Sequence, residues 1–460
     1  MSGDVAGRLG LAALLCVLVG VACTRVGTLP SEPPPRAAPI GRPVGEPAPP
    51  VGASAPAAPG NPGTGRAPRR FDEVRGLWVV RHSLTTPQSV RDAVTRAADA
   101  GFNTLLVQVR GRGDAAHPSA LEPRMEALAR ASPSFDPLAL AIAEGHARGL
   151  AVHAWLNVNV VTELTGVPDD PRHLVRAHPE ALMVPRELAR ELARSSPYDP
   201  RYLDRLLTWS RAHGNRVEGL YVAPWSARVR ERFEAVTVDL IERYDLDGVH
   251  LDYIRYPGPD FDYSAGSLAS FREWAAPRLS SGGRRALDRA AERDPLAWPD
   301  GQPALWSEFR REQVTRLLER VSFAVKTRRP WMTVSAAVLP DTLAARRDRL
   351  QDWPTWVRAG LLDAVAPMAY APDDALFRAQ VEQVVHVAPG VDVWAGIGSY
   401  LTGLQGTLRK ILIARDLGTD GIVLFSYDWV VSPSGGGGPA FLERVGRGFQ
   451  DARGCALCPR

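Results

Sequence analysis

Short apolar segments alternate with amphipathic stretches along the chain from about residue 71 onward. The apolar segments predict parallel strands, because strands buried on both faces are apolar nearly throughout. The stretches between them repeat apolar residues three and four positions apart, as helices with one buried face do. We expect strands at 76–81, 104–110, 151–160, 248–253, 333–339, 364–370, 393–400 and 421–427, and helices at 87–100, 137–148, 228–244, 305–326, 375–387 and 406–416.

This alternation predicts the α/β class and, more narrowly, a (β/α)8 TIM barrel. An open doubly wound sheet fits less well, because no glycine-rich phosphate loop follows the first strand. Long loops follow the third strand (162–225) and the fourth (258–304). Substrate sites of barrels are built from loops at the carboxyl ends of strands, so these loops predict an extended, partly roofed cleft. Tryptophans in or near the loops are expected either to stack against sugar rings or to pack over the barrel: Trp209, Trp225, Trp274, Trp298 and Trp306.

The segment from Asp247 to Pro257 contains a charged residue where a buried strand should be apolar. Asp252 follows Val249 and Leu251 at the end of the predicted fourth strand. Burying an unpaired carboxylate costs several kcal/mol. Asp252 is therefore either a core residue satisfied by backbone amides or a residue used in chemistry.

Other predicted strands also end in polar and aromatic residues. Carboxylates, neutral hydrogen-bonding groups and aromatic rings together are typical of a carbohydrate site. Neither a His-Glu-x-x-His metal motif nor a Gly-x-Ser-x-Gly nucleophile elbow occurs in the sequence, so we expect no metal and no cofactor. The candidate substrate-binding residues are Arg110, His153, Trp155, Asn157, Arg255, Tyr256, Tyr370, Tyr400 and Tyr427.

Cleavage of a glycosidic bond requires one protonated carboxylic acid and one ionised carboxylate. Asp252 is the candidate carboxylate, and Arg255 or Arg110 beside it would keep it ionised. The candidates for the acid are Asp114, Asp373 and Asp428, among which the sequence does not choose.

The two ends of the chain differ from the barrel region. Residues 1–22 hold an apolar run too short to span a bilayer, which takes roughly 20 residues, and they predict a signal peptide. Gly20–Cys23 resembles a bacterial lipobox, with Gly20 where Leu is usual, so we expect lipidation at Cys23; an ordinary cleaved secretion signal is the alternative. Residues 23–70 are rich in Pro, Ala and Gly and predict a disordered tether.

The barrel is then expected over 71–445, followed by a tail over 446–460. The tail contains Cys455 and Cys458, which favour a local disulfide over a zinc site. The formal charge of +4 comes with arginines spread along the whole chain, so nucleic acid is not an expected partner.

Several motifs in order along the chain resemble those of the glycosyl-hydrolase-like 10 family, whose members are often bacterial lipoproteins. They are residues 73–78, 107–114, 153–157, 247–257, 367–370 and 396–400. Residues Arg110, Asp114, His153, Asn157, Asp247, Asp252, Arg255 and Tyr370 fall on the family's motif positions. Met368 departs from the pattern by replacing a Gln that is usual in the sixth strand.

The resemblance implies a (β/α)8 barrel and an envelope protein that cleaves peptidoglycan glycan strands lacking stem peptides. The membrane is then a partner through the lipid anchor, and the oligomeric state is open. Two other hypotheses are a glycosidase of another polysaccharide and a non-catalytic glycan-binding lipoprotein. Asp247 is expected to be structural, because Asp-Gly favours a turn before the fourth strand.

Overall fold

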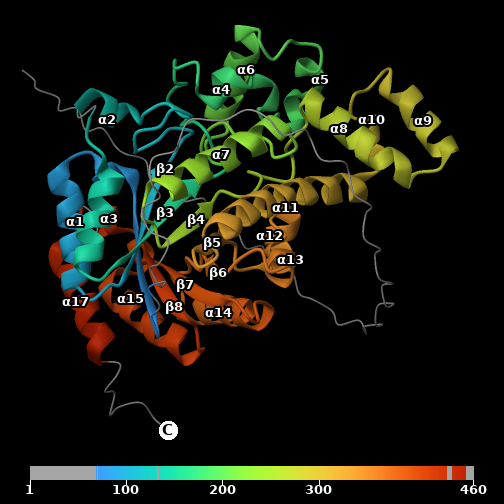
Figure 1. Cartoon of the computed structure of the whole chain (residues 1–460). Helices are drawn as coiled ribbons and strands as arrows, with labels where there is room; N and C mark the ends of the chain where they lie inside the picture. The colour runs from blue at the N-terminus through green and yellow to red at the C-terminus, as the bar shows by residue number, and fades with distance from the viewer. Residues whose placement is uncertain (1–68, 70, 132–133, 433–437, 452–460) are drawn as a thin grey trace, which may run out of the picture. The chain divides into compact units, whose positions relative to one another are not determined.

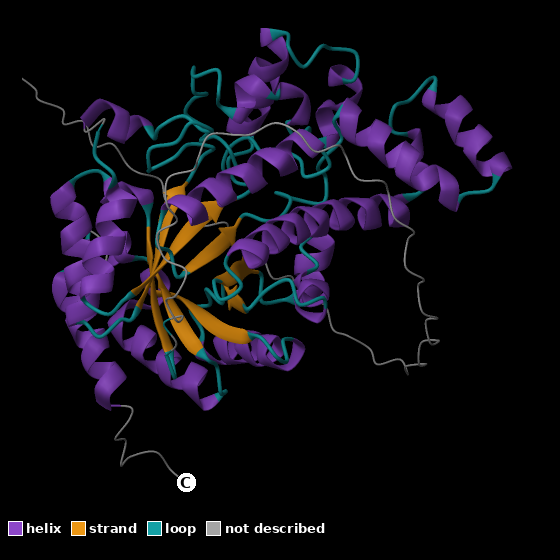
Figure 2. Ribbon diagram, viewed as in Figure 1, coloured by secondary structure: helices purple, strands orange, loops and turns teal. Residues whose placement is uncertain are grey.

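A computed structural model of the chain describes residues 69, 71–131, 134–432 and 438–451. Within these residues the strands close into a parallel barrel in the order β1 to β8, and β8 pairs back with β1. Figure 2 shows the strands in orange with helices packed around them. The predicted (β/α)8 barrel is therefore confirmed. The strands are β1 (Val74–Val79), β2 (Thr104–Arg110), β3 (Ala151–Asn157), β4 (Gly248–Asp252), β5 (Thr333–Val338), β6 (Ala364–Pro367), β7 (Asp392–Gly398) and β8 (Gly421–Phe425).

Each strand leads into one or more helices that return the chain to the start of the next strand. The helix predicted over 406–416 begins earlier, at Ser399, and Gly403 with φ 59° interrupts its helical path. The remaining predicted helices are present with ends moved by a few residues at most. The covering helices are α1 (Pro87–Asp99), α2 (Glu126–Ala131), α3 (Pro137–Ala147), α7 (Ala227–Arg243), α11 (Pro303–Arg328), α12 (Thr342–Asp348), α13 (Trp353–Arg358), α14 (Asp374–Val387), α15 (Ser399–Asp416), α16 (Tyr427–Val431) and α17 (Pro439–Asp451), with the 3-10 helix η1 (Arg81–Leu84) after β1.

Polar side chains fix where several helices begin. Thr86 accepts a hydrogen bond from the backbone N–H of Ser89, and Pro87 supplies the first helical residue of α1. Asp136 caps α3 and Ser226 caps α7 in the same way. Such caps satisfy backbone donors that a helix end leaves without partners, typically for about 1 kcal/mol.

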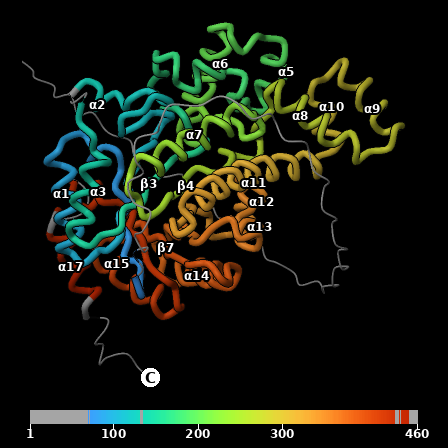
Figure 3. Tube along the Cα trace, in the orientation of Figure 1, coloured from blue at the N-terminus to red at the C-terminus, as the bar shows by residue number. Residues whose placement is uncertain are grey.

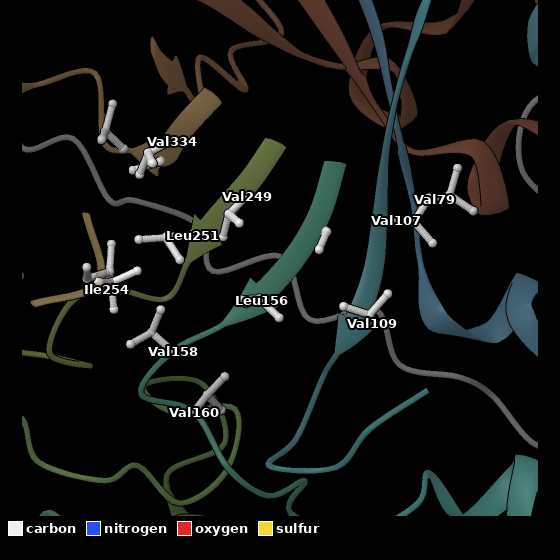
Figure 4. Packing of buried hydrophobic residues seen from close by; sticks show 14 of the residues in the cluster. Val79, Val107, Val109, Leu156, Val158, Val160, Val249, Leu251, Ile254 and Val334 are labelled. Carbon is white, nitrogen blue, oxygen red and sulfur yellow. The ribbon is translucent and has the colours of Figure 1, made fainter. Parts of the chain in front are cut away.

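The barrel has an apolar layer on both faces of its strands. Side chains such as Val107, Leu156 and Val249 point outward into the layer between strands and helices, as Figure 4 shows. Alternate residues point into the barrel, where Trp78 and Trp394 belong to a separate apolar cluster. Successive side chains of a strand point to opposite faces, so every second side chain points towards the axis of the barrel.

Both long loops form helical excursions from the barrel. Figure 1 shows α8, α9 and α10 in yellow, away from the strands, and α4, α5 and α6 in green; Figure 3 follows the green trace through α5 and α6. The second excursion has its own core, in which Phe271, Trp298, Trp306 and Phe309 pack together. The elements are α4 (Leu174–Ala177), η2 (Pro179–Ala181), η3 (Arg186–Leu188), α5 (Ala189–Leu192) and α6 (Pro200–Ala212) in the first, and α8 (Ala265–Ala275), η4 (Ala276–Arg278), α9 (Ser281–Ala291) and α10 (Ala297–Gly301) in the second.

The predictions for the two ends of the chain fall almost wholly outside the described residues. The signal peptide over 1–22, Cys23, the tether apart from Arg69, and the cysteines Cys455 and Cys458 therefore remain predictions. Helix α17 continues past residue 445 to Asp451. In the part of the chain that is described, no helix combines the length and apolarity needed to cross a membrane.

Candidate active site

The carboxylate of Asp252 lies at the carboxyl end of β4, with its donors gathered on one oxygen. Oδ1 accepts the backbone N–H of Tyr253 at 2.6 Å and Nη1 of Arg255 at 3.0 Å. The residue is 7% exposed, and no described residue donates a hydrogen bond to Oδ2. The guanidinium of Arg255 offsets the cost of holding a charge in this position. Asp252 thus has one oxygen fixed by the protein and one available to a ligand.

Tyr253 has an unusual backbone conformation directly after this carboxylate. Its φ is 52°, in the left-handed region that costs a non-glycine residue roughly 1 kcal/mol. Its hydroxyl donates to Glu218, and the guanidinium of Arg255 lies 4.4 Å from its ring centroid. Backbone strain of this kind persists where surrounding contacts enforce it and is frequent at functional sites.

Glu218 and Arg112 belong to this group, although neither was a candidate from the sequence. Glu218 comes from the first excursion, and Nη2 of Arg112 lies 3.6 Å from its Oε2. Glu218 falls in a loop that the sequence assigned to the cleft, but nothing near it distinguishes it from the other acidic residues there. Only its contact with Tyr253 does so.

The loops after β1 to β3 are joined by ion pairs beside this group. Nη1 of Arg81, after β1, lies 3.1 Å from Asp114, after β2. Arg81 also pairs with Glu163, after β3. These contacts fix three loops of the barrel mouth against one another.

Aromatic rings occupy the opposite part of the barrel mouth. The ring of Tyr370, after β6, lies 6.1 Å from Tyr400 and 5.6 Å from Phe425, between centroids. Burial and the nearby charge of Asp252 raise the pKa of Tyr370 well above its ordinary value. Its hydroxyl therefore stays protonated and can donate to a ligand. Tyr370 and Tyr400, both predicted for substrate binding, are brought together here.

His153 and Trp155 precede Asn157 on β3 and therefore lie deeper in the barrel than the register partner of Asp252. His153 packs against Trp394 at 5.7 Å between ring centroids, and burial lowers its pKa to about 4. Trp155 lies under Phe425, at 6.4 Å. Both side chains are buried, and their part in substrate binding stays a prediction. Like the mouth residues, they point into the barrel, but they come earlier along their strand and so lie further from its carboxyl end.

Arg110, a predicted substrate ligand, has its guanidinium occupied by contacts within the protein. It is 1% exposed, and its Nε lies 2.9 Å from both carboxylate oxygens of Glu122. Its Nη1 donates to the carbonyls of Asn157 and Val158 at the end of β3. Asn157, also buried, donates from Nδ2 to the carbonyl of Gly111 at 3.0 Å. These two residues connect the ends of β2 and β3. Asn157 is the register partner of Asp252 on β4, but neither side chain hydrogen-bonds to the carboxylate of Asp252 among the described residues.

The three candidate acids are placed differently. Asp114 accepts from Arg81 and from the backbone N–H of Arg112. Asp373 is exposed and caps α14 by accepting from the backbone N–H of Leu376, which accounts for it without catalysis. Asp428 follows β8, and burial raises its pKa.

Asp428 is held by two donors from the loop after β1. Its Oδ2 accepts the backbone N–H of Val80 at 2.7 Å, and its Oδ1 accepts the hydroxyl of Ser83 at 2.6 Å. Trp429, beside it, lies 6.4 Å from Tyr400 between ring centroids. Asp428 therefore borders the aromatic part of the mouth.

Two other predicted substrate ligands are buried away from solvent. Tyr256 is fully buried in the segment after β4, where its hydroxyl has no partner among the described residues. Tyr427 faces α1, where its hydroxyl accepts from Arg96.

The tryptophans of the excursions serve packing. Trp209 stacks on His213 at 4.1 Å between ring centroids, and Trp298 and Trp306 are buried in the core of the second excursion. Trp225 and Trp274 are partly buried and donate from Nε1 to Asp262 and Glu312. The aromatic surface of the mouth comes instead from residues after β6, β7 and β8.

The structural prediction for Asp247 is confirmed. Its Oδ2 accepts the backbone N–H of Val152 at 2.9 Å and contacts Nε2 of His146 at 2.8 Å, which anchors the start of β4 beside β3. Across the described residues, no group of three or more His, Cys, Asp or Glu is arranged to hold a metal ion.

The sequence of the chain is similar to sequences of known proteins. A model of the family described as glycosyl hydrolase-like 10 matches residues 73–400. The chain is similar to glycosyl hydrolase YngK of Bacillus subtilis (24% identity, 65% of this chain and 54% of that protein). It is also similar to glycosyl hydrolase DigH of Escherichia coli K12 (26% identity, 62% of this chain and 58% of that protein). The matched part thus spans little more than half the length of these relatives.

Solved structures share the fold at low sequence identity. An alpha-L-fucosidase isoenzyme 2 from Paenibacillus thiaminolyticus has a TM-score of 0.54 at 14% identity, over 84% of this chain and 50% of that one. The catalytic domain of a beta-amylase from Paenibacillus polymyxa has a TM-score of 0.53 at 10% identity, over 81% of this chain and 97% of that one. These likenesses concern the barrel.

Proposed function

The chain belongs to the glycosyl hydrolase-like 10 family, and from this premise we propose that it is a glycoside hydrolase. Its proposed substrate is the glycan of peptidoglycan, in strands that lack stem peptides. The proposal includes an envelope location, with a lipid on Cys23 holding the barrel at a membrane. Family membership and the barrel mouth support a glycoside hydrolase. The family resemblance supports the choice of substrate, and the sequence of residues 1–70 supports the location.

The observation that carries the proposal is the state of Asp252. Its Oδ1 is held by Arg255 and a backbone N–H, whereas its Oδ2 has no donor among the described residues. A buried carboxylate is costly to keep, and this one is oriented with an oxygen available at the end of a barrel strand. Tyr370 beside it offers a protonated hydroxyl, and the rings of Tyr400 and Phe425 offer faces for a sugar.

In this proposal Asp252 acts as the ionised member of a carboxyl pair. It either attacks the anomeric carbon or activates water, and in both cases the charge of the carboxylate opposes the positive charge that develops on the sugar ring. The second carboxyl must protonate the leaving oxygen. Asp428 fits this role through its raised pKa. Glu218, which contacts Tyr253, is the other carboxyl to be tested.

One experiment compares Asp252→Asn with Asp341→Asn on denuded peptidoglycan glycan. Asp341 only caps α12, and Asn is an equally good cap, so this variant is a matched control. Release of soluble fragments is expected from wild type and Asp341→Asn, with kcat lowered about 10²-fold or more in Asp252→Asn. Near-full activity of Asp252→Asn would show that Asp252 is not the catalytic carboxylate.

The other hypotheses give different outcomes in the same assay. Cleavage of another polysaccharide but not of denuded glycan would reject the proposed substrate. Binding without cleavage of any glycan would identify a non-catalytic protein. Asp428→Asn and Glu218→Gln then distinguish the acid, since only loss of the acid is rescued by an aryl glycoside whose leaving group needs no proton.

A further inference from the structure

Arg112 has a backbone fixed by its surroundings. Its N–H donates to Oδ1 of Asp114 at 2.8 Å, and its carbonyl contacts Nε2 of His173 at 2.8 Å. Gly113, which follows, has φ 70°, and a Cβ there would lie 2.8 Å from the same nitrogen of His173. The loop therefore holds the backbone of Arg112 in one position.

The side chain of Arg112, by contrast, has few acceptors. A guanidinium carries five N–H donors, yet Nη1 makes one long hydrogen bond to the carbonyl of Gly111 at 3.3 Å. The buried Nε has no partner among the described residues. The nearest carboxylate is Glu218 at 3.6 Å, and it also accepts the hydroxyl of Tyr253.

The neighbouring arginines Arg110 and Arg81, unlike Arg112, have acceptors for their guanidinium groups. Arg110 is fully engaged by Glu122 and two carbonyls, and Arg81 pairs with Asp114 and Glu163. Buried polar groups in folded proteins nearly always have partners, so an under-used guanidinium at a site points to a missing acceptor. The side chain of Arg112 is 21% exposed, so a ligand can reach it.

The place of Arg112 relates it to the proposed reaction. Its Cζ lies 5.9 Å from the ring centroid of Tyr253, the residue that follows Asp252. Arg255, the partner of Asp252, packs on the same ring. A sugar bound at Asp252 would therefore have a neighbouring sugar or substituent near Arg112.

We propose that Arg112 binds a carboxylate carried by the glycan, so that the site selects acidic sugar chains over neutral ones. This rests on the proposed function, because it places a glycan at Asp252. A carboxylate is favoured over a hydroxyl because it matches the planar fork of a guanidinium with two parallel hydrogen bonds and compensates its charge. The carboxylate could belong to a lactyl ether group or to a uronic acid.

The test measures binding in the full-length Asp252→Asn protein, so that cleavage does not interfere. Three ligands are compared by calorimetry: denuded peptidoglycan glycan, which carries lactyl carboxylates; oligomers of hyaluronan, which carry uronates; and neutral oligomers of N-acetylglucosamine. Arg112→Gln and Arg112→Lys are added to this background. Arg328→Gln is the matched control, because it removes the same charge at the end of α11, just before β5 begins.

We expect Arg112→Gln to weaken binding of at least one acidic ligand about 10-fold or more, which corresponds to about 1.4 kcal/mol. Neutral oligomers should bind unchanged, Arg112→Lys should lie between, and Arg328→Gln should behave like the background protein. Whichever acidic ligand responds identifies the source of the carboxylate. Retained binding of neutral oligomers also shows that the variant is folded.

Two results would overturn the inference. One is an equal loss of affinity for acidic and neutral ligands, which would mean that Arg112 only shapes the site. The other is no loss for either acidic ligand. Both can occur while wild type cleaves glycan. A wild type that cleaves nothing refutes the proposed function, and the binding comparison still decides whether Arg112 recognises a carboxylate.

Discussion

Replacing Glu122 with Gln would remove the charge that compensates Arg110. Both residues are 1% exposed, and Nη2 of Arg110 lies 2.7 Å from the glutamate. The substitution conserves shape and leaves an acceptor for Nε. Its effect therefore reports almost entirely on the lost charge.

The expected cost follows from the burial of the pair. Removing one partner of a buried ion pair typically costs about 3–5 kcal/mol, because the other charge stays buried and unpaired. Since the Gln amide still accepts one hydrogen bond, we expect the lower end, about 3 kcal/mol. Glu234→Gln is the control: it breaks the solvent-exposed pair with Arg320, for which about 0–1 kcal/mol is expected.

Urea unfolding followed by tryptophan fluorescence measures this difference as a shift of the midpoint at unchanged slope. Substrate affinity of the folded variant should equal that of wild type. A loss below about 1 kcal/mol would refute the structural role of Arg110, given the typical cost of a broken buried pair. Weakened substrate binding at unchanged stability would return Arg110 to the substrate ligands that the sequence predicted.

Three further results are expected. Burial lowers the pKa of His250 to about 3 and that of His153 to about 4. In the unfolded chain both imidazoles have the ordinary pKa of about 6.5. The free energy of unfolding should therefore fall as the pH drops from 6.5 towards 4, by up to about 3 kcal/mol for each ring. Nitrogen NMR would contradict this if either ring protonated above pH 5. Trp306→Ala should cost about 3–5 kcal/mol within the core of the second excursion, so limited proteolysis should cut α8–α10 first, and cuts spread evenly over the barrel would refute it. Cys23→Ala should move the protein from the membrane to the soluble fraction, and unchanged fractionation would reject the lipid anchor.

The strand pattern was sufficient to predict the barrel because both faces of its strands are buried. Each predicted strand is present, with ends that differ by up to three residues, since apolar residues continue past the last barrel hydrogen bond. Asp252 was predicted as a candidate for a related reason: burying a charged side chain at the end of such a strand is costly unless the charge is paired or takes part in chemistry. Arg255, three residues later, was close enough in sequence to be assigned as its partner, and the ion pair is present.

The position of each inward side chain along the barrel axis was harder to predict from the sequence. His153 and Asn157 share the inward parity of Asp252, but the parity does not say how far along the axis a side chain lies. Asn157 pairs with Asp252 in register, yet its side chain turns to the carbonyl of Gly111. Arg110 is placed at the end of β2, but a distant Glu122 binds it.

The sequence by itself determined the fold, the strand on which the chemistry is proposed and the residue at its end, because strand burial and local spacing are written in consecutive residues. Only the tertiary structure decided which groups surround Asp252. Glu218 and Arg112 come from loops of different strands, and they meet through Tyr253 at contacts that no local pattern encodes. Such pairing also decides whether the guanidinium of an arginine is paired with a carboxylate of the protein. Arg110 is paired in this way with Glu122, whereas Arg112 has few acceptors and is the proposed ligand of the glycan.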